Sequence, residues 1–136
     1  MSFPLEVAEA VAAAAKSTTN AEGFPAVCIS IVDAAAHPVL FARMDGAILG
    51  AIDVAARKAR TAALFQKDSA VLGEVMQPGA SCYSLEHSNG GLISFGGGVV
   101  LRDKIGAVIG AVGISGASVE EDEIIARAAA NAASYA

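Results

Sequence analysis

One stretch of the chain, Gly96 to Gly116, constrains the fold more than any other and reads GGGVVLRDKIGAVIGAVGISG. Its valines and isoleucines suit two pleated strands, and the polar residues Arg102, Asp103 and Lys104 interrupt them as a turn does. Glycines recur within the strands, where a missing side chain lets another backbone or a flat ligand come close. The stretch therefore predicts a β-hairpin with one smooth face, which could serve the fold, a subunit interface or a pocket.

The segments around this hairpin predict helices and a second hairpin. In chain order we expect a helix capped by Ser2 and running to about Thr19, then strands over 26–32 and 39–43. A helix over 49–66 follows, and then a short helix to Met76 capped by Asp68 and Ser69. An irregular segment over 77–91 leads to the glycine-rich hairpin, and a capping box at Ser118–Glu121 begins the final helix. Hairpins rather than β-α-β crossovers imply an antiparallel sheet covered by helices. The predicted class is therefore α+β, in the order α-β-β-α-α-β-β-α, as one domain over residues 1–136.

The composition bears on partners and location. Hydrophobic residues make up 54% of the chain and charged residues only 17%, so a monomer would expose apolar patches and we expect a homo-oligomer, a dimer or higher. The net charge of -5 leaves no basic stripe for nucleic acid. The longest apolar run, 107–114, is too short to span a bilayer, and no basic segment followed by an apolar run marks a signal peptide. We therefore expect a soluble cytoplasmic protein without a membrane partner.

Three familiar kinds of site are not predicted. Cys28 and Cys82 are too few and too isolated for a disulfide framework or a thiolate metal site. The chain has only two histidines, and the acidic run Glu120–Glu123 at a helix start would splay too widely to converge on a metal, so it is better explained as helix capping. Because the glycines at 96–98 lead into a strand and not into a helix, they also lack the context of a dinucleotide fingerprint.

The irregular segment before the glycine run holds the strongest candidates for chemistry. His87 adjoins Glu86 there, and a polar connection of this length is often functional. A neighbouring carboxylate can raise the pKa of an imidazole, so both residues are candidates for acid–base catalysis and His87 also for axial ligation. The other histidine, His37, precedes Pro38 in a predicted turn, where either an exposed turn residue or a ligand is compatible with the sequence.

Two basic residues could hold an acidic ligand. Arg43 ends a predicted strand, where it fits either a salt-bridged turn with Asp45 or an arginine at the rim of a pocket. Lys58 lies one helical turn before Thr61, and the two side chains could line a cavity.

Several short segments in a fixed order resemble one known family. They are Ile31–Asp33, His37 through Arg43–Gly46, the KARTA segment at 58–62, the FGGGV segment at 95–99 with Arg102, the IGAVGISG segment at 109–116, and Glu121–Glu123. Together they resemble the GlcG/HbpS-like family of small haem-binding or haem-degrading domains, which also forms the C-terminal part of some PduO-type corrinoid adenosyltransferases. The resemblance implies a profilin-like fold with a five-stranded antiparallel sheet, oligomers up to an octamer, and haem bound between subunits in some members. The pattern of residues yields four strands, and the fifth would lie within 81–94.

Two functions follow from the resemblance and from the candidate residues. The first is binding of haem or a related tetrapyrrole, with no other cofactor. The residues it implies are His37 or His87 as axial ligand, Arg43, Lys58 and Arg102 for the propionates, and Gly97 and Gly98 along the pocket. The segment 81–89 matches no motif of the family, which leaves open a cofactor-independent lyase, isomerase or hydrolase acting on a small organic acid in a catabolic pathway. His87 and Glu86 would then move a proton. A structural subunit without a ligand is a third alternative.

Overall fold

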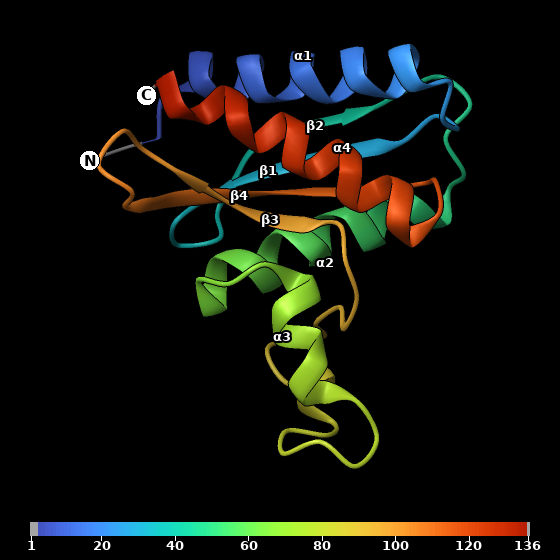
Figure 1. Ribbon diagram of the computed structural model, residues 1–136, viewed down its shortest axis with the longest axis vertical. Coiled ribbons are helices and arrows are strands. Elements are labelled where there is room, and N and C mark those ends of the chain that lie inside the picture. The colour runs from blue at the N-terminus through green and yellow to red at the C-terminus, as the bar shows by residue number, and fades with distance from the viewer. Residues whose placement is uncertain (1–2, 136) are drawn as a thin grey trace.

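The computed structural model describes residues 3–135 and places one open antiparallel sheet between helices on its two faces (Figure 1). The strands are β1 (Cys28–Asp33), β2 (Pro38–Arg43), β3 (Gly98–Arg102) and β4 (Val108–Ser115), in the spatial order β2-β1-β4-β3. The helices are α1 (Leu5–Glu22), α2 (Gly50–Phe65), α3 (Ser69–Met76) and α4 (Val119–Asn131). The predicted α+β class is confirmed, and two short 3-10 helices, Leu85–His87 and Ala132–Tyr135, add to the expected order.

The expected fifth strand is wrong for the part of the chain that the structure describes, where the sheet has four strands. Segment 81–94 forms turns around the 3-10 helix and extends away from the sheet together with α3 (Figure 1). Ser84, Asn89 and Gly90 adopt φ values of 78°, 52° and 73°. A left-handed conformation at these positions breaks the extended backbone that a strand requires.

The first helix differs from its predicted bounds at both ends. Pro4 precedes its first turn, and the predicted cap Ser2 lies outside the described residues. The helix continues to Glu22 because its stop signal is Gly23, which adopts a φ of 70°. The amides of Gly23 and Phe24 donate to the carbonyls of Asn20 and Thr19, so the last turn closes as a glycine-terminated helix usually does.

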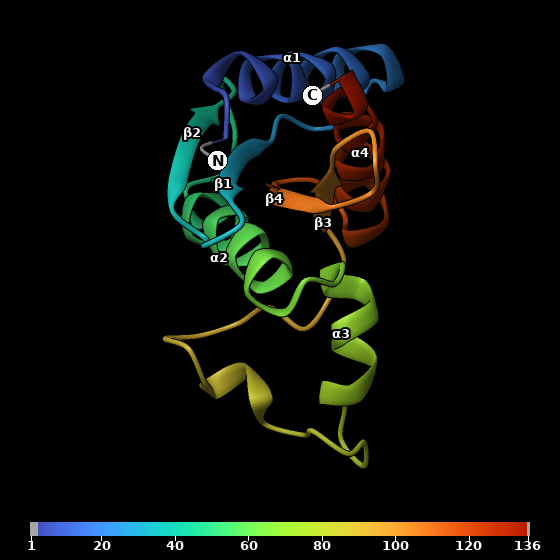
Figure 2. The ribbon, with the colours of Figure 1, turned by 90° about the vertical axis from the view of Figure 1, so that its left-hand side faces the viewer.

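The two faces of the glycine-rich hairpin differ in side-chain size, and this explains its glycines. Helices α1 and α4 cover one face of the sheet and α2 covers the other (Figure 2). A Cβ atom on Gly98 would lie 2.3 Å from the carbonyl oxygen of Lys58, and one on Gly113 would lie 2.1 Å from that of Ala55. The face toward α2 is therefore smooth so that the helix backbone can approach it. Toward α1 and α4 the hairpin presents the branched core residues Val99, Leu101, Val112 and Ile114.

The outer edge of β3 is covered by the start of α3. Gly98 donates its N–H to Ser69 Oγ at 2.9 Å, and Val100 donates its N–H to Asp68 Oδ1 at 3.0 Å. Asp68 occupies the predicted N-cap position, but its carboxylate bonds to the strand and not to its own helix. Side chains thus occupy edge amides that could otherwise pair with another strand.

Candidate functional site

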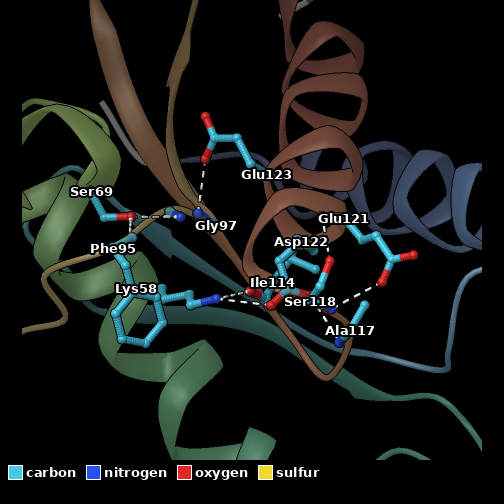
Figure 3. A network of polar contacts seen from close by, with 11 residues as sticks. Lys58, Ser69, Phe95, Gly97, Ile114, Ala117, Ser118, Glu121, Asp122 and Glu123 are labelled. Atoms are coloured by element: carbon cyan, nitrogen blue, oxygen red, sulfur yellow. Dashed lines mark hydrogen bonds and ion pairs between the residues drawn. The ribbon is translucent and has the colours of Figure 1, made fainter.

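A buried ion pair joins α2 to α4, two helices on opposite faces of the sheet (Figure 3). Lys58 Nζ lies 3.0 Å from Asp122 Oδ2 and donates to the carbonyl oxygen of Ile114 at 2.8 Å. The other carboxylate oxygen of Asp122 accepts the N–H of Ala117 at 3.0 Å. The exposed fractions of Lys58 and Asp122 are 0% and 2%. Both charges are therefore withdrawn from solvent and supplied with partners inside the protein.

Burial is the largest influence on both groups. It lowers the pKa of Lys58 and raises the pKa of Asp122, while the attraction between the two charges opposes each shift. Removing one partner would leave an unpaired charge in the interior, which costs about 3–5 kcal/mol. Lys58 was expected to bind a ligand, but here its ammonium offers no exposed surface to one.

The two predicted ligand-binding glycines lie buried beside this pair. Gly97 donates its N–H to Glu123 Oε1 at 2.8 Å, and the N–H of Gly98 is taken by Ser69. A Cβ atom on Gly97 would lie 2.5 Å from Lys58 Nζ, and the φ of this residue is +118°. Both amides thus face protein acceptors, and Gly97 allows the chain to pass close to the ammonium.

The sequence did not predict Asp122 as a site residue, because it lies in an acidic run that was explained as helix capping. The capping box itself is confirmed, since Ser118 Oγ accepts the N–H of Glu121 at 3.1 Å and Glu121 Oε1 accepts the N–H of Ser118 at 3.0 Å. Helical spacing could have indicated that Asp122 is buried, because it lies three, four and seven residues before apolar residues on the same face of the helix. The buried residues that share this stripe with Asp122 are Ile125, Ala126 and Ala129.

A groove of about 590 Å³ opens between β3, the start of α3 and the end of α4. Of the predicted ligand-binding residues, Arg102 lines this groove. Three further basic residues line it that the sequence did not single out: Lys67, Lys104 and Arg127. They come from separate segments of the chain, so no local motif could have indicated them.

His37 and Arg43 belong to neither of these two regions. They lie near opposite ends of β2, and neither lines the groove. The side chain of His37 is 78% exposed, and its Nδ1 lies 3.6 Å from Asp33 Oδ2. Arg43 is also exposed. Within this chain, the structure therefore does not bring these two predicted ligand residues together.

Two arginines of α2 fasten the loop that follows α3. Arg57 donates through Nη1 to the carbonyl oxygen of Gly90, and Arg60 donates through Nη2 to that of Asn89 at 2.9 Å. Figure 2 shows this loop extending from the body of the protein below α2. The loop is thus anchored near its end while its middle part projects.

The predicted proton-transfer residues lie in this projecting part. His87 is exposed at the end of the 3-10 helix Leu85–His87. The Oε1 atom of Glu86 is buried and has no hydrogen-bond partner among the described residues. Neither side chain lines the groove, so the structure does not unite them with Arg102 in one cavity.

Residues 3–135 contain neither a cluster of metal-ligating side chains nor a membrane-spanning helix. No group of three or more His, Cys, Asp and Glu side chains there is arranged to hold a metal ion. No described helix is long and apolar enough to cross a membrane.

The chain is similar to known sequences over most of its length. Residues 3–131 match the sequence model of a family described as haem-degrading protein HbpS-like. Over 105 residues, or 76% of this chain, the sequence is 45% identical to the corrinoid adenosyltransferase PduO of Salmonella typhimurium. The match covers 31% of PduO, so the chain spans less than a third of that relative.

Two solved structures share the fold along almost the whole chain. The structure of a PduOC–haem complex is 37% identical, with a TM-score of 0.89 over 97% of this chain and 95% of that one. The ORFY protein of Klebsiella pneumoniae is 33% identical, with a TM-score of 0.90 over 96% of this chain and 90% of that one.

Proposed function

The chain belongs to the HbpS-like family of haem-degrading proteins, and from this premise we propose that it binds haem or a related tetrapyrrole. The observation that carries the proposal is the similarity in sequence and fold to PduOC, whose structure was solved as a haem complex. The adenosyltransferase activity named for PduO is not part of the proposal, because the chain matches only a minor part of that protein.

The side chains of the chain fit haem in two respects. The exposed imidazoles of His37 and His87 are accessible to an iron that approaches from solvent, and Arg102 lies in a groove with other basic residues that suit propionates. Haem would supply an iron centre that an imidazole can ligate. Because neither histidine lines the groove, we propose that a neighbouring subunit contributes the imidazole.

The exposed apolar side chains support a homo-oligomer, as a dimer or higher and up to an octamer. Ile48 and Leu49 before α2 are 66% and 73% exposed, Tyr83 in the projecting loop is 60% exposed, and Ile105 in the β3–β4 turn is 89% exposed. Apolar surface of this extent favours contact with another subunit. Light scattering on the purified protein measures the subunit number. The cytoplasmic location stays a prediction from the sequence.

A cofactor-independent lyase, isomerase or hydrolase for a small organic acid is the second candidate. The unpartnered Oε1 of Glu86 next to the exposed His87 is the observation in its favour. Arg102, which could hold the acid, lines a groove that neither His87 nor Glu86 lines. Haem binding is the better supported function because PduOC, which is similar in sequence and fold, was solved as a haem complex.

Titration of the purified protein with haemin tests the proposal. We expect a saturable shift of the Soret band, and we expect either His37→Ala or His87→Ala to abolish that shift while the other variant serves as the matched control. A linear, unsaturable response of the wild-type protein would overturn haem binding. Equal spectra for both variants and the wild type would refute the histidine ligands and leave haem binding in place.

A further inference from the structure

We propose that the groove beside β3 recognises carboxylate groups attached to an apolar body, through Arg102, Lys67 and Lys104. The carboxylates could be the propionates of a tetrapyrrole or those of a free organic acid, and the experiment below separates these sources. Only the first source rests on the proposed function.

The distribution of charge points to an anionic ligand. Four of the nine lysines and arginines of the chain line this groove, but only two of its fourteen acidic residues do. The chain as a whole carries a net charge of -5, so the groove is locally positive on an acidic protein. A concave surface with charges of one sign concentrates ligands of the opposite sign.

The two acidic residues are already engaged with the protein. Asp68 Oδ1 accepts the N–H of Val100 at 3.0 Å, and its side chain is only 18% exposed. Asp103 Oδ1 accepts the amides of Ile105 and Ala107 at 3.1 and 2.9 Å. Asp68 Oδ2 also lies 3.8 Å from Arg127 Nη2, so this carboxylate pairs with one cation of the groove. Neither acidic residue forms an ion pair with Arg102, Lys67 or Lys104 among the described residues.

Three of the four basic side chains remain available. Arg127 is occupied, because its Nε lies 2.7 Å from Glu123 Oε2. Arg102 uses Nη1 to hold the carbonyl oxygen of Gly106 at 2.9 Å, which anchors the side chain and leaves its other N–H donors for a ligand. The side chains of Lys67 and Lys104 make no hydrogen bond or ion pair with another described residue. Arginine can bind a carboxylate with two parallel hydrogen bonds, so Arg102 is the principal contact.

The groove also has an apolar wall. Val71 of α3 is 49% exposed there, and Val99 of β3 and Ala130 of α4 line the same space. Its volume of about 590 Å³ lies within the usual range for small-molecule pockets, roughly 300–1,000 Å³. A ligand with carboxylates at one edge and an apolar body would satisfy both kinds of surface.

Binding of two tetrapyrroles and one small acid to wild-type and variant proteins tests the inference. The probes are metal-free protoporphyrin IX, its dimethyl ester, and adipate, measured by absorbance or calorimetry. We expect Arg102→Gln to weaken protoporphyrin IX binding about tenfold, Arg102→Lys to restore part of the loss, and the ester to bind about tenfold more weakly than the free acid. Lys104→Gln should cost about threefold, and Lys16→Gln, an exposed charge on α1, should have no effect.

The outcomes separate the two proposals. If haemin and protoporphyrin IX bind but neither Arg102→Gln nor esterification weakens binding, the groove inference is wrong and the proposed function survives. If no tetrapyrrole binds but adipate binds in an Arg102-dependent way, the proposed function fails and the groove is a site for a free acid. If neither haemin nor any of the three probes binds, both are overturned. A thermal melt of each variant shows that it is folded.

Discussion

The buried ion pair and the groove beside β3 use the same types of side chain for different purposes. Lys58 and Asp122 are almost completely buried and bound to each other, whereas Arg102 and Lys104 are exposed and keep donors free. A charge that is desolvated and paired fixes the geometry of the protein, because any ligand would first have to displace its partner. A charge at the rim of a groove can exchange water for a ligand at little cost to the fold.

Two segments that carry the family resemblance contribute to the buried ion pair and its surroundings. Lys58 belongs to the KARTA segment and lies beside Gly97 of the glycine run, and both were expected to contact a ligand. Within this chain the two segments pack against each other around a buried ammonium. This packing gives both segments a role in the fold, and ligand contacts of Lys58 and Gly97 stay a prediction from the sequence.

The largest expected effect comes from breaking the buried pair. Lys58→Met should lower the free energy of unfolding by about 3–5 kcal/mol, because it leaves the Asp122 carboxylate unpaired in the interior. The double variant Lys58→Met/Asp122→Leu should recover most of this loss, since no charge is then buried. Chemical denaturation of the two single variants and the double variant measures the coupling.

If Lys58→Met lowers the free energy of unfolding by less than about 1 kcal/mol, the pair contributes no more than a surface ion pair does. That result would contradict the structural role assigned to the buried pair. A double variant whose loss equals the sum of the two single losses would show that the residues are not coupled.

The close approach of α2 to the sheet should give the next largest effect. Gly98→Ala would put a Cβ atom 2.3 Å from a backbone oxygen of Lys58 and should destabilise the protein by about 1–3 kcal/mol. Gly50→Ala is the matched control, because a Cβ atom there meets nothing within 4 Å at the first residue of α2. Equal denaturation midpoints for the two variants would show that the smooth face of the hairpin is not needed for packing.

The pH dependence of the single variants should reveal which charge is left behind. Without Lys58, the raised pKa of Asp122 rises further, so the folded state binds a proton that the unfolded state does not and stability increases as the pH falls below neutral. Asp122→Asn leaves Lys58 with a lowered pKa, so the stability of this variant should increase as the pH rises above neutral.

Each slope can reach about 1.4 kcal/mol per pH unit while one proton separates the folded and unfolded states. Denaturation between pH 5 and 9, with the wild type as reference, measures them. Parallel pH profiles for the two variants would mean that neither group remains buried and charged after its partner is removed.

Much of the fold could be predicted from the sequence because its signals are local. The polar turn at Arg102–Lys104 divides two runs of branched residues, and the Ser118–Glu121 box marks the start of α4. The pairing of Lys58 with Asp122 could not be predicted in this way, because the two lie 64 positions apart and meet only when α2 and α4 pack against the sheet. The groove is equally non-local, since α3, α4 and the β3–β4 turn each supply part of its lining.

Titration with protoporphyrin IX tests the division between structural and ligand-binding charges most directly. We predict that the double variant Lys58→Met/Asp122→Leu binds this porphyrin as the wild type does. Arg102→Gln should bind the porphyrin about tenfold more weakly and remain as stable as the wild type to within about 0.5 kcal/mol. Loss of binding in the folded double variant, with unchanged binding in Arg102→Gln, would contradict this division of roles.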